Sequence, residues 1–141
     1  MKVIGFSFSK ISIERLSNKI EGLKVNANID ISEITLLKSV DFLKTNNDLI
    51  GIKFVYSVKY DPDYVKIEFS GDLILEIEPK MAKEIIKEWK DKKMSEEFRI
   101  FVFNIILRKS DLKALQLEDE LNLPLHLPLT QIQKGQEKKQ E

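Results

Sequence analysis

Residues 50–78 contain two runs of alternating apolar and polar side chains, separated by one tight turn. The apolar positions are Ile52, Phe54, Tyr56, Val58 and Tyr60 in the first run, and Val65, Ile67, Phe69, Leu73, Leu75 and Ile77 in the second. A period of two places each apolar set on one face of a strand. Asp61, Pro62 and Asp63 between the runs are typical turn residues. The pattern therefore predicts a long β-hairpin with one apolar and one charged face, whose apolar face another element must cover.

Composition limits the class of protein. At 141 residues the chain has the length of one domain. Its 23 basic residues balance its 23 acidic residues, so charge does not indicate a nucleic-acid-binding protein. The absence of cysteine excludes disulfides, zinc ribbons and thiol catalysis. We expect neither a signal peptide nor a stable membrane insertion, because the first residues turn polar quickly and the longest apolar run, 100–107, is short. These features predict a cytoplasmic protein.

Two further strands are predicted before the hairpin. Phe6 and Phe8 occupy even positions, whereas Ile11 and Ile13 occupy odd positions. One extra residue in a strand produces such a change, so we predict a β-bulge near Ser9. Alternation over 25–31 predicts the second strand. Residues 32–48 mix helical and strand spacing. They could extend the second strand or form a loose crossover, and we favour a mixed connection that ends in a turn at 46–48.

Two helices are predicted after the hairpin. Pro79 suits a first helical turn, and an apolar stripe predicts an amphipathic helix over 80–93. Ser95 is expected to cap a second helix, in which 98–107 is apolar almost all round. A buried strand is the alternative for 98–107, because periodicity alone does not exclude it. The polar continuation from Arg108 favours the helix.

The C-terminal region predicts an extended segment. Pro124 and Pro128 are incompatible with a helix, and the leucines that alternate around them indicate chain laid on an apolar surface. Residues 133–141 are polar and are expected to be disordered. The fold class is therefore α+β: a four-stranded antiparallel sheet followed by two C-terminal helices and an extended Pro/Leu tail, forming a single domain over 1–132.

Little in the sequence indicates catalysis. His126 is the one histidine, and no serine lies in a nucleophile-elbow context, so we assign it a surface or packing role. The five glycines are scattered and form no phosphate-binding loop. Asp61 and Asp63 are explained by the hairpin turn without a metal. The acidic run 118–120 is interpreted as a solvated face. We predict a protein that is not an enzyme and needs neither metal nor cofactor.

The predicted helix at 98–107 is more apolar than one sheet contact requires. A helix that is apolar on two sides needs cover on both. A subunit contact or a groove for an apolar partner would supply the second cover.

The order of these elements resembles the SecB family of export chaperones, including the SecB-like chaperones that serve toxin–antitoxin systems. The similarity extends over about residues 1–132 and rests on the bulged strand at 6–13 followed by 25–31, the central hairpin at 50–78, and the helix at 101–107 that leads into the leucine-proline segment 122–130. This chain is neutral and lacks the strongly acidic surface typical of the bacterial export members, which argues against a SecA-type motor partner.

The resemblance implies an ATP-independent holdase, built as a homotetramer from a dimer of dimers. Unfolded or precursor polypeptides would bind in apolar grooves between helix and sheet, without a cofactor and without nucleic acid. The groove residues that it suggests are Phe6, Phe8, Ile11, Phe98, Phe101, Ile105, Leu123, Leu125 and Leu127.

Two other functions are compatible with the same pattern. A curved sheet and a helix can enclose one small hydrophobic ligand, which predicts a closed cavity. A dedicated adaptor would use the same fold to bind one partner, such as an antitoxin. The sequence does not distinguish such an adaptor from a general holdase.

Overall fold

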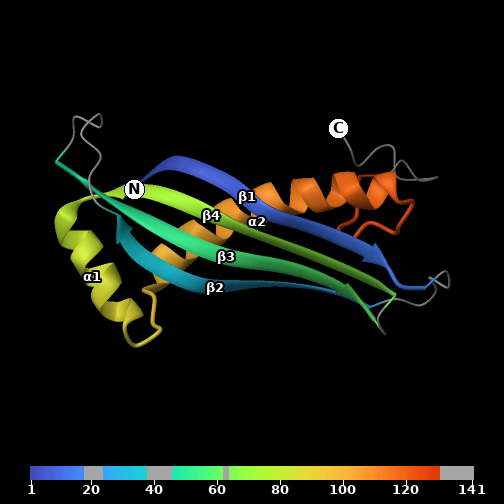
Figure 1. Ribbon diagram of the computed structural model, residues 1–141, viewed down its shortest axis with the longest axis horizontal. Helices are drawn as coiled ribbons and strands as arrows, with labels where there is room; N and C mark the ends of the chain where they lie inside the picture. The colour runs from blue at the N-terminus through green and yellow to red at the C-terminus, as the bar shows by residue number, and fades with distance from the viewer. Residues whose placement is uncertain (18–23, 38–45, 62–63, 131–141) are drawn as a thin grey trace, which may run out of the picture.

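The computed structural model describes residues 1–17, 24–37, 46–61 and 64–130. Pro62, Asp63 and the predicted disordered segment 133–141 lie outside them. The elements follow the predicted order: β1 (Lys2–Arg15), β2 (Val25–Leu37), β3 (Asp48–Tyr60), β4 (Val65–Ile77), α1 (Pro79–Trp89) and α2 (Glu96–Glu120). The strands form one antiparallel sheet in the order β1-β4-β3-β2, which leaves β1 and β2 at its edges (Figure 1). The α+β prediction is confirmed.

The predicted hairpin forms the centre of the sheet. Tyr56 of β3 pairs with Phe69 of β4, and Phe54 pairs with Gly71, so the two apolar sets share one face. All the apolar side chains of the predicted sets are buried, whereas alternate residues such as Lys53 and Lys66 point to the other face and are exposed. The prediction of one apolar and one charged face is therefore confirmed.

Bulges re-aim both edge strands. The register of β1 shifts between Phe8 and Lys10, as predicted. The register of β2 shifts between Ile31 and Glu33, where Ser32 Oγ donates a hydrogen bond to the Lys53 carbonyl. The interpretation of 32–48 as a mixed connection is wrong for 32–37, which continue β2. The bulge moves the apolar positions from odd to even, and this change hides the alternation in the sequence.

The two helices begin where the sequence predicts. Pro79 lies in the first turn of α1, which ends earlier than the predicted 80–93 because Lys92 adopts a left-handed conformation (φ 57°). The amide of Lys93 there donates to the Glu88 carbonyl (3.0 Å), a C-terminal arrangement that closes a helix. Ser95 Oγ accepts a hydrogen bond from the Phe98 amide (3.3 Å), which confirms the cap of α2. The strand alternative for 98–107 is excluded.

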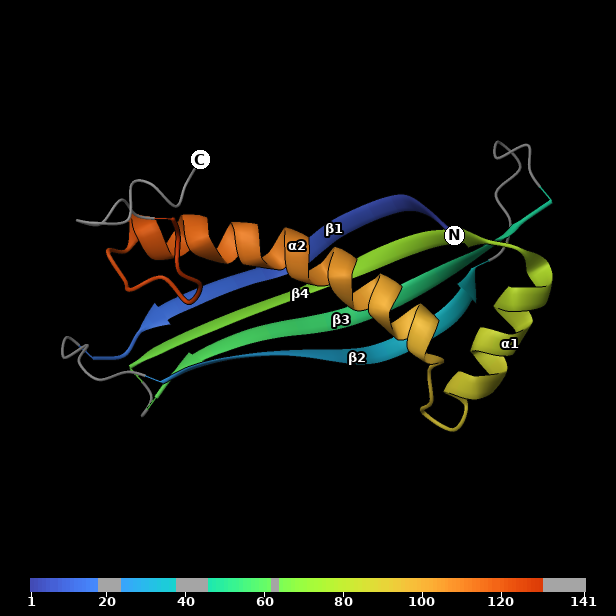
Figure 2. The same ribbon diagram turned by 180° about the vertical axis from the view of Figure 1, so that it is seen from behind.

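Helix α2 crosses the apolar face of the sheet diagonally, and α1 lies at one end of the sheet against β2 and β3 (Figures 1 and 2). The buried residues of α2 recur at every fourth position: Phe98, Val102, Ile106, Ser110, Ala114 and Glu118. A helix has about 3.6 residues per turn, so a stripe with a period of four rotates gradually around the helix. That rotation lets one helix follow a twisted sheet obliquely. No helix among the described residues is long and apolar enough to cross a membrane.

Candidate functional site

Two adjoining hollows lie between α2 and the edge strand β2, and together they form what we call the β2 groove. One, of about 350 Å³, is lined by Ile29, Asp30, Ile31, Trp89, Lys92, Met94 and Phe103. The other, of about 200 Å³, is lined by Ala27, Asn28, Ile29, Phe103 and Leu107. Because Ile29 and Phe103 line both hollows, the groove is continuous along β2. Most of its lining side chains are aliphatic or aromatic, and the polar ones are Asn28, Asp30 and Lys92.

The β2 groove arises from the way α2 crosses the sheet. Phe103 and Leu107 lie about a quarter turn from the buried stripe, so they project sideways over β2. Since β2 is an edge strand of the sheet, none of the other described strands pairs with its outer side. Lys92 sits at the rim, with its Nζ 4.5 Å from the ring centroid of Trp89. An ammonium group over an aromatic face stabilises that arrangement and keeps the ring beside the groove.

Five of the predicted groove residues lie on the opposite side of α2, and we call them the β1 rim: Phe6, Phe8, Ile11, Phe101 and Ile105. Phe6 and Phe8 are half-buried in an aromatic cluster. The ring centroids of Phe6 and Phe54 are 5.3 Å apart, and those of Phe8 and Phe69 are 5.4 Å apart. Ile11 is exposed. Phe101 and Ile105 occupy the flank of α2 that faces away from β2 and are half-buried against the core. The rim is therefore partly accessible apolar surface.

The other four predicted residues are divided between core and surface. Phe98 and Leu123 are core residues, only 3% and 6% exposed. Leu125 is half-buried, and Leu127 is exposed. The residues of the β2 groove were not among the predicted set. The pair Phe103 and Leu107, four residues apart on a second helix face, was the sequence signal that could have identified them.

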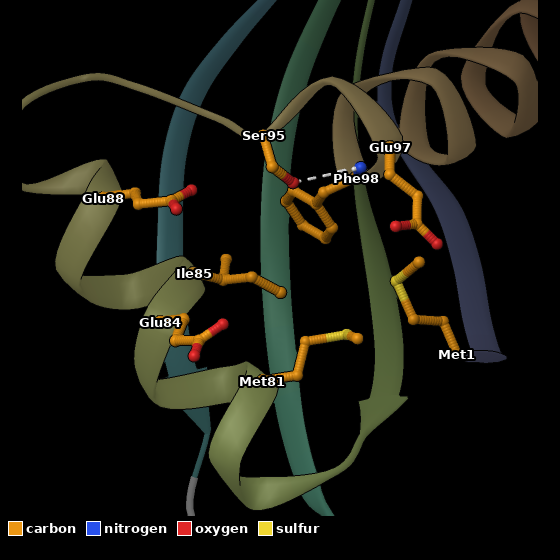
Figure 3. A pocket seen from close by; sticks show the side chains of 8 residues that line it. All are labelled: Met1, Met81, Glu84, Ile85, Glu88, Ser95, Glu97 and Phe98. Carbon is orange, nitrogen blue, oxygen red and sulfur yellow. Dashed lines mark hydrogen bonds between the residues drawn. The ribbon is translucent and has the colours of Figure 1, made fainter.

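A third hollow, of about 210 Å³, lies between α1 and the start of α2 (Figure 3). Met1, Met81, Ile85 and Phe98 supply its apolar lining, and Glu84, Glu88, Ser95 and Glu97 supply the polar part. Figure 3 shows the two methionine side chains directed towards the space between the helices. The three glutamates give this hollow an acidic rim that the β2 groove does not have.

A buried polar cluster joins the end of α2 to the chain that follows it. The His126 side chain is only 2% exposed. Its Nδ1 lies 2.7 Å from Glu118 Oε2, and its Nε2 lies 3.1 Å from both Asp111 Oδ1 and the Tyr56 hydroxyl. Tyr56 donates a hydrogen bond to Asp111 Oδ1 (2.7 Å). Two predictions are corrected here: Glu118 is not part of a solvated face, and His126 has specific polar partners rather than a surface or packing role.

The chain reverses direction at the end of α2 and folds back towards β3. Asn122 adopts a left-handed conformation (φ 54°), and the Leu123 amide donates to the Glu118 carbonyl (2.8 Å). Asparagine tolerates this conformation better than most residues, and the bond satisfies a free carbonyl of the last turn. The Tyr60 hydroxyl donates to the Pro124 carbonyl, and the His126 amide donates to Glu118 Oε1 (2.9 Å). Segment 121–129 is thus held to both α2 and β3.

The cluster shifts the pKa values of its members. Burial lowers the pKa of His126, but the hydrogen bonds and negative charges of Glu118 and Asp111 outweigh burial, and the pKa is raised above its ordinary value. Burial, aided by the neighbouring carboxylates, raises the pKa of Tyr56 and of Tyr60, so both hydroxyls stay protonated. Within the described chain, no group of three or more His, Asp or Glu side chains is arranged to hold a metal. The Glu118 carboxylate and the His126 ring are closed to solvent, whereas the Asp111 side chain is 23% exposed.

No protein-family model and no curated protein sequence matches the chain. A solved structure that is similar is the Mycobacterium tuberculosis SecB-like chaperone in complex with a ChAD peptide from the HigA1 antitoxin. It is 11% identical, the match covers 94% of this chain and 90% of that chain, and the TM-score is 0.49.

Proposed function

We propose that this protein is an ATP-independent holdase chaperone that binds unfolded or precursor polypeptide segments in the β2 groove. The observation that carries the proposal is the continuous β2 groove between α2 and an edge strand, whose apolar lining includes Ile29, Trp89, Met94, Phe103 and Leu107. Both hollows open to solvent, which suits a long polypeptide better than one enclosed hydrophobic ligand.

The geometry accounts for weak sequence preference. In an extended peptide, alternate side chains lie about 6–7 Å apart and point to the same side. Two such side chains would enter the adjoining hollows, and burial of each large apolar side chain would contribute about 1.5–3 kcal/mol before the cost of ordering the chain. The free edge of β2 offers main-chain hydrogen bonds to any sequence. Affinity then depends on apolar content rather than on particular residues.

The accessible predicted residues extend this binding surface. In this proposal the β1 rim forms a second contact region for longer clients, with Leu125 and Leu127 near the end of α2. A subunit contact would use a different face. Ile100 and Leu112 project from α2 away from the sheet and are 48% and 61% exposed, so they suit the helix contact of a homotetramer.

Replacement of Phe103 by aspartate tests the groove. A charge there would oppose burial of an apolar client, so we expect loss of protection when a chemically unfolded model protein, such as luciferase, is diluted into buffer without ATP. Light scattering measures the aggregation. The matched control is Asn104→Asp, which places the same charge on the neighbouring, exposed position of α2.

The result is interpretable only if both variants keep the fold, as judged by circular dichroism and thermal melting. If Phe103→Asp is unfolded, Leu107→Ser provides a milder change in the same groove. Protection by wild type that persists in a folded groove variant would contradict the proposed site. Absence of protection by wild type against two unrelated unfolded proteins would contradict a general holdase and favour a dedicated adaptor.

A further inference from the structure

Segment 121–129 occupies the continuation of the β2 groove. The groove ends near Ala27 and Leu107. Ala27 pairs with Val58, which lies between Tyr56 and Tyr60 on the same face of β3, and Asp111 follows Leu107 by one helical turn. The returning segment contacts both tyrosines, through His126 and the Pro124 carbonyl. Figure 2 shows this loop beside the last turns of α2, on the helix-covered face of the sheet.

The segment resembles an apolar client in composition. Leucines alternate along it at 121, 123, 125, 127 and 129, and Leu123 is buried in the core. It therefore covers aromatic surface of β3 that would otherwise lengthen the apolar floor available to a bound polypeptide.

The hydrogen-bond geometry favours a doubly protonated His126, because both ring nitrogens lie within hydrogen-bond distance of a carboxylate oxygen. Glu118 accepts from Nδ1, while Nε2 faces Asp111 Oδ1, an atom that already accepts from the Tyr56 hydroxyl. The imidazolium ion supplies a donor to each carboxylate. In the neutral ring, the Nε2 lone pair would face Asp111 Oδ1, and one tyrosine proton would have to serve two acceptors. Loss of the proton thus removes a charge-assisted donor from between the two carboxylates, which weakens the contact between the segment and α2.

We propose that His126 is a proton-operated latch that holds segment 121–129 over the far end of the β2 groove. Loss of its proton releases the segment and uncovers the Tyr56 and Tyr60 side chains for polypeptide binding. The regulatory part of this inference rests on the proposed function, whereas the latch itself does not. The charged or titratable side chains that face His126 from the described elements are Asp111 and Glu118 on α2, Tyr56 on β3, and Tyr60 close to Glu118.

The direction of the pH effect follows from the raised pKa of His126 in the latched state. The latch is fully formed below the pKa of the released, solvent-exposed histidine, about 6.5, and is lost as pH rises through the latched-state pKa. Each unit between the two pKa values changes the latching equilibrium about tenfold. Alkaline conditions therefore open the segment, and acidic conditions close it.

The single histidine makes the latch measurable in the unmodified protein. Its ring resonances in an NMR titration report one pKa, and hydrogen exchange of the His126 amide reports release, because that amide donates to Glu118. We expect a pKa above that of an unfolded peptide. We also expect the His126 amide to lose protection from exchange as pH rises through the pKa of His126, while the amides of β3 and β4 stay protected. The loss should be about tenfold for each pH unit by which the latched-state pKa exceeds the released-state pKa. The latch would be overturned by a His126 pKa at or below that of an unfolded peptide. It would also be overturned by equal protection of the His126 amide at pH values below and above that pKa.

Charge-neutral variants provide the second test. Glu118→Gln keeps a carbonyl acceptor but removes the charge, so the pKa of His126 should fall and the segment should open at lower pH. Glu120→Gln removes the same charge from an exposed position two residues away and should leave the titration nearly unchanged. Equal effects of the two variants would show that His126 senses only the general field of the helix end, and this result would overturn the specific contact. If Glu118→Gln does not fold, Asp111→Asn tests the other carboxylate in the same way.

Client binding is measured separately, with a permanently unfolded, carboxymethylated protein as the probe. Tighter binding above the pKa of His126 than below it supports regulation, and binding that is unchanged while the segment opens overturns it. If the segment opens but no probe binds at either pH, the proposed holdase function fails and the latch stands.

Discussion

Replacement of Gly71 by alanine tests how closely the strands are packed on the apolar face. Gly71 of β4 lies between Phe8 of β1 and Phe54 of β3 in the paired registers. A Cβ atom built there would lie 2.4 Å from the Ser7 carbonyl oxygen and 2.7 Å from Cζ of Phe54, whereas ordinary contact begins at 3.4 Å. The overlap with the carbonyl oxygen is with backbone, so rotation of a side chain cannot relieve it. Strand β1 has to move away from β4.

The expected cost follows from that displacement. Overpacking a well-packed core costs about 1–3 kcal/mol, and an overlap of about 1 Å with main chain belongs in the upper half of that range. We therefore expect the free energy of unfolding to fall by about 2–3 kcal/mol. For a domain of this length that corresponds to a Tm lower by about 7–10 °C. Phe54 must shift too, and since its ring stacks on Phe6, the β1 rim should lose order.

Thermal melting and urea unfolding measure the effect, and Gly5→Ala is the matched control in the neighbouring strand. A Cβ atom on Gly5 would meet only Cδ1 of Ile74, at 3.9 Å. That variant should be as stable as wild type or more stable by about 0.5–1 kcal/mol, because glycine is unfavourable inside a strand. If the two variants have the same stability, β1 does not approach β4 as closely as the structure places it, and the reasoning about the rim is refuted.

Four further predictions concern single side chains. Ser95→Ala should lower the free energy of unfolding by about 1 kcal/mol, since the cap of α2 is lost; urea unfolding would show no change if the cap contributed nothing. Ser110→Ala should be neutral or stabilising by about 1 kcal/mol, because its buried Oγ has no partner in the described part of the chain; clear destabilisation would reveal a missed bond. Tyr56→Phe should cost about 1–2 kcal/mol and change the NMR pKa of His126, because Asp111 loses a donor; an unchanged pKa would exclude coupling. Phe101→Asp should stay folded and weaken client binding at the β1 rim; global unfolding in a thermal melt would make Phe101 a core residue instead.

The features that the sequence predicts best are those decided by neighbouring residues. The hairpin, the β1 bulge and the Ser95 cap each depend on a few consecutive positions, and all three are confirmed. The second half of β2 was missed for the same reason. A bulge at Ser32 moves the apolar side chains from odd to even positions. The alternation of apolar and polar residues is therefore interrupted there, although the strand continues.

The side of α2 that forms the β2 groove could not be read from the sequence. Phe101 and Phe103 project from opposite flanks of α2, and both flanks are apolar. The choice between them depends on the strand order, in which β1 pairs with β4 and leaves β2 on the far edge. It also depends on the oblique path of α2, which results from a buried stripe with a period of four. Neither is a local property, so the sequence pattern did not distinguish the two flanks. The predicted groove residues Phe6, Phe8 and Ile11 therefore lie on the β1 side.

The buried polar cluster shows how one residue in the helix dictates the path of the chain after it. The stripe that begins at Phe98 reaches Glu118 after five steps of four residues and places its carboxylate against the sheet. An ionised carboxylate there would cost several kcal/mol unless donors surround it. The backbone amide and the ring of His126 both lie within hydrogen-bond distance of the Glu118 carboxylate, and the Tyr60 hydroxyl is close to it. Burial of Glu118 therefore favours the path in which the segment folds back over β3 and brings His126 to its carboxylate.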